Sequence, residues 1–124
     1  MVEKAFDENN SGSFFDVARA IIDATQMGAK IIHMSLGGYI DTTTLHDAVK
    51  YAYDQGVLLI AAAGNDASTA KTYPAAYGEV VAVTATDQND GSVWWTQYGD
   101  WVEVSAPGVR IFSTLPTYHV TIND

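Results

Sequence analysis

Apolar residues in the first part of the chain recur at the spacing of an α-helix and then gather into a short apolar run. The helical positions are Phe14, Val17, Ile21 and Ala24. This spacing predicts a helix with one buried face. Ser13 and Asp16 have the Ser-x-x-Asp spacing of a capping box at its start, and Gly28 stands where a helix is expected to stop. The apolar run 30–36 predicts a strand directly afterwards.

The same order of helix, glycine and strand occurs a second time. Thr44 and Asp47 form a second predicted capping box, Gly56 follows the helix, and residues 57–63 predict another strand. The predicted buried face of this second helix is Leu45, Ala48, Val49, Ala52 and Tyr53. The nearly continuous apolar character of 57–63 is typical of a strand covered on both faces. Two such units in residues 13–63 favour α/β architecture with right-handed crossovers.

The rest of the chain has a different pattern. Residues 80–86 and 101–107 predict strands, and 109–115 predicts another short one. The acidic cluster Asp87, Asn89 and Asp90 is interpreted as a polar turn because it lacks the spacing of a calcium loop. Trp94 is either packed under a hairpin or an interface anchor. No linker divides the chain, so one domain over residues 1–124 is expected, with its β-rich part at 73–116.

Composition narrows the classes of function. The net charge is −9 and Lys and Arg number only six among 124 residues, which argues against nucleic-acid binding. The absence of cysteine excludes disulfides and a cysteine nucleophile. No apolar run approaches the roughly 18 residues of a membrane span. The first residues, "MVEKAFDENNSGS", lack the features of a signal peptide.

Small residues mark the ends of two predicted strands, where ligands bind in open parallel sheets. The first end is Ser35-Leu36-Gly37-Gly38 and the second is Ala62-Ala63-Gly64-Asn65. Both are consistent with ordinary tight turns. Alternatively, the bare backbone lets a ligand approach while the Asn65 amide donates to a developing negative charge. The sequence contains neither G-x-G-x-x-G nor G-x-x-x-x-G-K-[ST], the two glycine-rich motifs that bind nucleotides.

Four segments together resemble the subtilisin-like serine proteases in order and spacing, from about Asp7 to Pro116. They are "GAKIIHMSLGG", "GVLLIAAAGND", "YPAAYGEVVAVTATDQND" and "VEVSAPGVRIFSTLP". The resemblance implies a three-layer, parallel-sheet subtilisin-like α/β fold, here incomplete and with a β-rich C-terminal part. It also implies a serine endopeptidase that hydrolyses peptide bonds by acyl transfer and acts on peptide or protein substrates.

The resemblance also implies roles for particular residues. Asn65 matches the amide donor to the tetrahedral intermediate. Two walls of the primary specificity pocket are matched by Ser35, Leu36 and Gly37 on one side and by Ala62, Ala63 and Gly64 on the other. The edge on which a substrate pairs as an added strand is matched by Ser11, Gly12 and Ser13. Phe14 and Val17, with Leu36, are expected to line the next large apolar subsite.

A weak cation site is the last implied feature. Glu103 would supply its carboxylate, together with the backbone carbonyls of Ala75, Tyr77 and Val80. The expected ion is a structural Ca²⁺ or a monovalent cation. No cofactor is expected to be required for the chemistry.

The family's motifs for the catalytic aspartate, histidine and serine do not occur in this sequence. Of the three histidines, His33 is interpreted as a partnered core or interface residue, His46 as solvated, and His119 as part of a terminal loop. The isolated chain is therefore expected to be inactive, because a triad needs all three groups in contact. A non-catalytic module that binds peptides or a partner remains the alternative, and a truncated product without an independent role is a third.

Two expectations concern the setting of the chain. If segments that flank it in the family are absent, strand edges and apolar faces are left uncovered. The isolated chain is then expected to form homo-oligomers, by rearrangement or exchange of elements, or to associate with the missing segments. The resemblance suggests secretion, although the chain shows no signal peptide.

Overall fold

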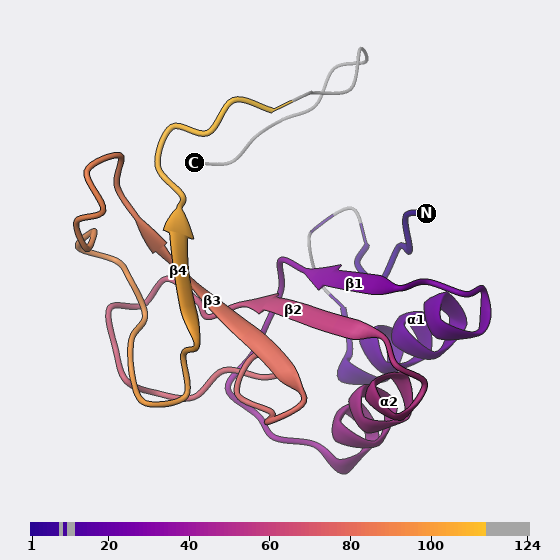
Figure 1. The fold of residues 1–124 in the computed structure, drawn as a ribbon. Coiled ribbons are helices and arrows are strands. Elements are labelled where there is room, and N and C mark those ends of the chain that lie inside the picture. Colours follow the sequence, from indigo (N-terminus) through magenta and orange to yellow (C-terminus); the bar gives the residue numbers. More distant parts are fainter. Residues whose placement is uncertain (8, 10–11, 114–124) are drawn as a thin grey trace.

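A parallel sheet of four strands organises the computed structural model, which describes residues 1–7, 9 and 12–113. The strands lie in the order β1-β2-β3-β4 (Figure 1). The elements are α1 (Phe14–Gln26), β1 (Ile31–Met34), α2 (Thr43–Asp54), β2 (Leu58–Ala62), β3 (Val80–Thr86) and β4 (Val104–Pro107). This architecture confirms the predicted α/β class with its two helix–strand units.

Helix α1 begins where the sequence predicts. Ser13 is its N-cap, and its hydroxyl accepts from Asp16 N–H at 3.2 Å while the Asp16 carboxylate accepts from Ser13 N–H. The Ser13 hydroxyl also donates to the Asp16 carboxylate, and this bond, together with the one from Ser13 N–H, holds the pKa of the exposed Asp16 carboxyl below its usual value. The helix ends before Gly28, whose φ of +84° is a conformation that glycine adopts without strain.

Helix α2 begins earlier than predicted but ends before Gly56, as predicted. Its N-cap is Thr42, whose hydroxyl accepts from Leu45 N–H at 3.3 Å, so the predicted capping box at Thr44 and Asp47 is wrong. The predicted inward face is correct except at Tyr53, which is 54% exposed. Tyr53 lies one turn from Val49 but at the margin of the apolar stripe.

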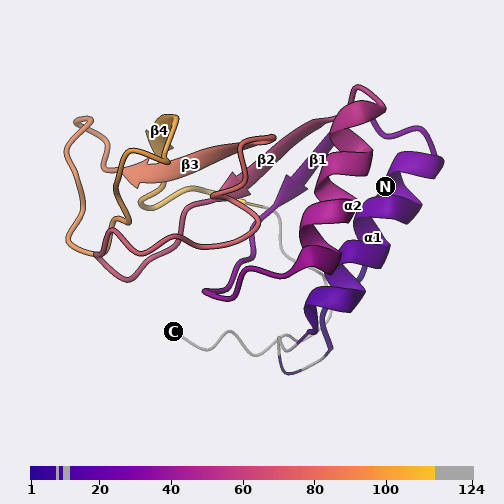
Figure 2. The same ribbon diagram turned by 90° about the horizontal axis from the view of Figure 1, so that it is seen from below.

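Both helices cover the same face of the sheet and pack against each other (Figure 2). Leu59 and Ala61 of β2 point into this core with 0% exposure, whereas Leu58 on the other face is 46% exposed. The expectation that this strand is covered on both faces is therefore wrong for the described residues. Among the helices of the described residues, none is long and apolar enough to cross a membrane.

The second half of the chain consists largely of loops around β3 and β4. Residues 109–113 form no strand, and the end of the strand predicted at 109–115 lies outside the described residues. Asp87 forms the predicted polar turn, since its Oδ1 accepts from Asn89 N–H and Gly91 N–H, both at 2.8 Å. Trp94 is 88% exposed, so its packing under a hairpin is wrong, and its alternative role as an interface anchor stays a prediction.

Candidate active site

The two predicted pocket walls leave the sheet side by side. Strands β1 and β2 are parallel with Met34 opposite Ala61, so segment 35–37, which follows β1, and segment 62–64, which begins at the last residue of β2, start at neighbouring positions. Both strands point toward the same end of the sheet, which is also the end where the long loops gather (Figure 1). This is the end at which ligands bind in open parallel sheets.

Thr72 and Tyr73 join these two walls. The Thr72 hydroxyl donates to the Ala63 carbonyl at 2.7 Å. A Cβ added at Gly64 would lie 3.4 Å from the Thr72 methyl group, and one added at Gly37 would lie 3.8 Å from Thr72 Cβ. Gly38 and Tyr73 exchange two backbone hydrogen bonds at 3.0 and 2.8 Å. The buried Thr72 therefore lies against both glycines and holds the walls together.

Asn65 lies at the exposed tip that follows the second wall. It is preceded by Gly64, whose φ of +110° turns the chain sharply away from β2. Because Asn65 is exposed, its amide is accessible to a bound ligand. The Tyr39 hydroxyl donates to the carboxylate of Asp66, and this bond raises the pKa of the Tyr39 phenol. The bond also ties the loop after β1 to the loop after β2.

The segment 95–101 holds the loop 64–70 from the other side, and the sequence did not point to it. The hydrogen bonds are Ala67 N–H to the Trp95 carbonyl (3.2 Å), Asp66 N–H to Gln97 Oε1 (3.1 Å), Gln97 Nε2 to the Ala70 carbonyl (2.7 Å), Tyr98 N–H to the Ser68 carbonyl (3.2 Å) and Trp101 Nε1 to the Thr69 carbonyl (3.2 Å). The two segments are about thirty residues apart along the chain, so no local periodicity reports these contacts.

The predicted substrate edge is described only in part. Ser11 lies outside the described residues. Gly12 and Ser13 line a groove of about 540 Å³ together with Phe6 and Asp16. The Ser13 hydroxyl also donates to Asp16 at 2.6 Å, so its primary contact is the cap of α1. A Cβ at Gly12 would lie 2.5 Å from the Ala5 carbonyl oxygen, which explains why glycine occupies this position.

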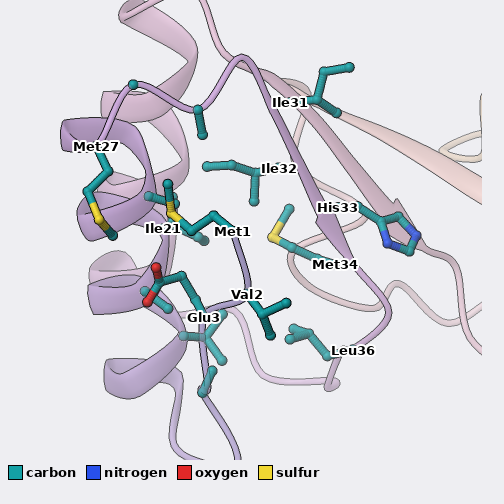
Figure 3. Close-up of a pocket in the computed structure, with 16 residues that line it drawn as sticks. Met1, Val2, Glu3, Ile21, Met27, Ile31, Ile32, His33, Met34 and Leu36 are labelled. Carbon is teal, nitrogen blue, oxygen red and sulfur yellow. The ribbon is translucent and has the colours of Figure 1, made fainter. Parts of the chain in front are cut away.

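Residues of the predicted apolar subsite divide between two places. Val17 and Leu36 line a cavity of about 620 Å³ between α1, β1 and the first residues of the chain. Ile32 and Met34 point from β1 toward Ile21 in this cavity, and Val2 lies beside Leu36 (Figure 3). The Phe14 ring instead lies against the turn after β1, where a Cβ at Gly38 would come within 2.9 Å of it.

The described histidines have partners other than those expected. His33 is exposed, so its expected place in the core is wrong, whereas its role at an interface stays a prediction; its Nε2 lies 3.4 Å from the Ser35 hydroxyl. His46 is not simply solvated, because its Nε2 lies 3.3 Å from Glu79 Oε2 and its ring stacks on Tyr77 at 4.2 Å. His119 lies outside the described residues. Within the described part of the chain, no serine, histidine and carboxylate form one hydrogen-bonded set.

Glu103 makes a backbone contact at the predicted cation site. Its Oε2 accepts from Ala82 N–H at 2.6 Å, and the Tyr77 carbonyl accepts from Val80 N–H at 3.0 Å. Ca²⁺ takes about 6–8 oxygen ligands, so one carboxylate and the carbonyls of Ala75, Tyr77 and Val80 do not complete its shell. The residues present thus fit a calcium ion poorly. Cation binding there stays a prediction.

The chain belongs to the subtilase family, whose model matches residues 1–124. It is 48% identical over 112 residues to the thermophilic serine proteinase of Bacillus sp. (strain AK1), covering 90% of this chain and 28% of that protein. It is 46% identical over 120 residues to the minor extracellular protease Epr of Bacillus subtilis (strain 168), covering 95% of this chain and 19% of that protein.

A solved structure has the same fold. The psychrophilic subtilisin-like protease Apa1 from the Antarctic psychrotroph Pseudoalteromonas sp. AS-11 matches with a TM-score of 0.76 and 42% identity. The match covers 85% of this chain and 24% of that structure. The chain therefore spans well under half the length of these relatives, and the fold is confirmed as subtilisin-like.

Proposed function

We propose that the protein to which this chain belongs is a serine endopeptidase of the subtilisin type, with Asn65 as its oxyanion donor. The observation that carries the proposal is the position of Asn65 just beyond the carboxyl end of β2, where it is exposed and directly follows the second of the two walls that Thr72 joins. A preorganised amide there donates to the charge that develops on the scissile carbonyl oxygen. The substrates are peptides or proteins.

The walls define where a substrate side chain would bind. The walls 35–37 and 62–64 would border the substrate side chain, and apolar Leu36, which is half-buried, and Ala62, which is exposed, favour an apolar one. The reaction is acyl transfer from the peptide to a serine, followed by hydrolysis. In the described residues only the oxyanion and binding functions have candidates, so we propose that the isolated 124-residue chain is inactive.

The full-length protein tests the role of Asn65 directly. Asn65→Ala is expected to lower kcat on a chromogenic peptide by about 10²–10³-fold, a magnitude that comes from subtilisin itself. KM should change little, because the donor acts mainly in the transition state. Asn89→Ala, an exposed amide in the polar turn after β3, is the matched control and should leave kcat unchanged. An unchanged kcat in Asn65→Ala would contradict the proposal.

A second candidate function is a non-catalytic module that binds peptides at the same walls. It is favoured by the absence, within the described residues, of a hydrogen-bonded serine, histidine and carboxylate. Peptide binding to the isolated chain that is lost in Leu36→Asp but retained in Asn65→Ala would support this function. Hydrolysis by the isolated chain that a serine-directed phosphonate blocks would exclude it.

We also propose that the isolated chain associates with itself through the sheet face that the helices leave uncovered. Apolar side chains on and beside this face are strongly exposed, among them Ile31 at 60%, Leu58 at 46% and Val104 at 47%. Exposed apolar surface of this kind drives association. Light scattering at micromolar concentration should report an oligomer, and a clean monomer would contradict this.

Secretion is proposed from the family and from one relative that is named an extracellular protease. Detection of the protein by mass spectrometry in the culture medium, at higher abundance than in washed cells, would support it. Retention of the intact protein in the cell fraction would contradict it.

A further inference from the structure

Gln97 is a fully buried polar residue at the loop that carries Asn65. Its relative exposure is 0%, although it belongs to the loop-rich half of the chain. Its Oε1 accepts from Asp66 N–H at 3.1 Å and its Nε2 donates to the Ala70 carbonyl at 2.7 Å. A buried amide is tolerated only when its polar atoms have partners, and both ends of this side chain have one.

The contacts of Gln97 lie on both sides of Asn65. The Asp66 N–H belongs to the peptide group that directly follows the Asn65 Cα, so the bond to Oε1 orients that peptide plane. On the other side, a Cβ added at Gly64 would lie 3.5 Å from both Cδ and Oε1 of Gln97. One side chain therefore packs against the residue before Asn65 and hydrogen-bonds to the residue after it.

The loop needs such support because its backbone is unusual. Gly64 has a φ of +110° and Ala67 a φ of +50°, so two positive-φ residues flank the pair Asn65-Asp66. A residue other than glycine in this region costs free energy and persists only when surrounding contacts determine it. The contacts here come from segment 95–101, and Gln97 alone in that segment joins the loop at two points through its side chain.

We propose that Gln97 is a positioning residue that holds the Asn65 amide in its oxyanion-binding geometry. The inference rests on the proposed function of Asn65. A catalytic donor must be held within about 0.5 Å of its productive position. Gln97 touches no substrate in this scheme; it acts through its packing against Gly64 and its hydrogen bond from Asp66 N–H.

The test is a double-mutant cycle in the full-length protein. Gln97→Met keeps the length of the side chain and removes both hydrogen bonds. It is expected to lower kcat by about 10- to 100-fold with KM changed less than about twofold, as small misplacements of catalytic groups do. In an Asn65→Ala background the same substitution should lower kcat no further, because the residue it positions is gone. Gln97→Asn, which is too short to span both partners, should give the same pattern.

Thr96→Val is the matched control. Thr96 is buried beside Gln97, but its hydroxyl donates at 2.8 Å to the Ala85 carbonyl of β3 and not to the loop that carries Asn65. It should destabilise the fold without lowering kcat at temperatures well below the unfolding midpoint. A comparable loss of kcat in Thr96→Val would show that Gln97 acts through general stability.

The outcomes separate the two proposals. If Asn65→Ala itself leaves kcat unchanged, the proposed function fails, and the role of Gln97 fails with it. Suppose instead that Asn65→Ala lowers kcat. The positioning role alone is then overturned if Gln97→Met and Gln97→Asn leave kcat unchanged. It is also overturned if either substitution lowers kcat further when it is combined with Asn65→Ala. Loss of kcat in both single variants with no further loss in the double variant supports it.

Discussion

The helix-rich half of the chain, residues 13–63, and the loop-rich half, residues 64–101, share one apolar core but differ in the polar side chains that they bury. In the first half the fully buried side chains are aliphatic, as at Leu45, Val49 and Leu59. In the second half the buried side chains include Thr72, Thr96 and Gln97, which hydrogen-bond to backbone groups of the loops or β3.

The difference follows from where the backbone N–H and C=O groups of each half find their hydrogen-bond partners. Helices and strands pair their own N–H and C=O groups, so their side chains are left to bury apolar area. An irregular loop leaves carbonyls such as those of Ala63 and Ala70 for side chains to satisfy. Thr25, a buried polar residue of the helical half, illustrates the contrast, because it bonds to the Ile21 carbonyl of its own helix at 2.7 Å.

Deleting apolar volume should have the largest effect, and a fully buried leucine of the helical half tests it most directly. Leu45→Ala removes a side chain with 0% exposure and is expected to lower the free energy of unfolding by about 2–5 kcal/mol. Tyr53→Ala on the same helix is the control, since Tyr53 is 54% exposed and should change stability little. Urea unfolding followed by circular dichroism measures both. Equal losses would contradict the assignment of the buried face.

Removing one buried hydrogen bond should have the next largest effect, in the loop half. Thr72→Val keeps the shape of the side chain and leaves the Ala63 carbonyl without its 2.7 Å partner, so a loss of about 1–3 kcal/mol is expected. Thr69→Val, at an exposed side chain in the adjoining loop, is the matched control. If Thr72→Val were neutral in the same unfolding experiment, the claim that hydrogen bonds hold this half would be wrong.

The contrast between the halves also explains how much the sequence predicts. The helical half is predictable because apolar periodicity, caps and glycines such as Gly28 are local signals. Even there, α2 begins from Thr42 and not from Thr44, since two nearby threonines offer the same local chemistry. Whether other elements cover one or both faces of β2 could not be predicted, because an apolar run alone does not show which faces are packed against other parts of the chain.

Much less of the site is predictable from local signals. Asn65 and the two walls followed from resemblance to a family, and the structure places the walls side by side. Thr72 and Gln97, which hold the walls and the loop, were missed. Their partners lie 9 and 27–31 residues away along the chain, and no spacing rule connects a buried glutamine to such distant backbone groups.

A smaller effect is expected at the helix caps. They test whether the reciprocal cap of α1 stabilises the helical half more than the single-bond cap of α2. Ser13→Ala removes a reciprocal capping box and should lower the free energy of unfolding by about 1 kcal/mol. Thr42→Ala removes a single 3.3 Å bond to Leu45 N–H and should cost less. Urea midpoints of the two variants measure the difference. A larger loss for Thr42→Ala would reverse the ranking of the two caps.

The smallest effect concerns the pH dependence of the cap of α1. The hydrogen bonds that Ser13 donates from its hydroxyl and its N–H lower the folded pKa of Asp16 below the unfolded value. The unfolded chain therefore binds this proton more readily, so the stabilisation is present above the unfolded pKa of about 3.9 and is lost as pH falls through the folded pKa. Carboxyl-carbon NMR titration should show the Asp16 pKa rising toward its ordinary value in Ser13→Ala but not in Thr42→Ala. An unchanged Asp16 pKa in Ser13→Ala would mean that something other than the cap stabilises the Asp16 carboxylate. The hydrogen bond between the Ser13 hydroxyl and Asp16 would then not explain why α1 starts after Ser13.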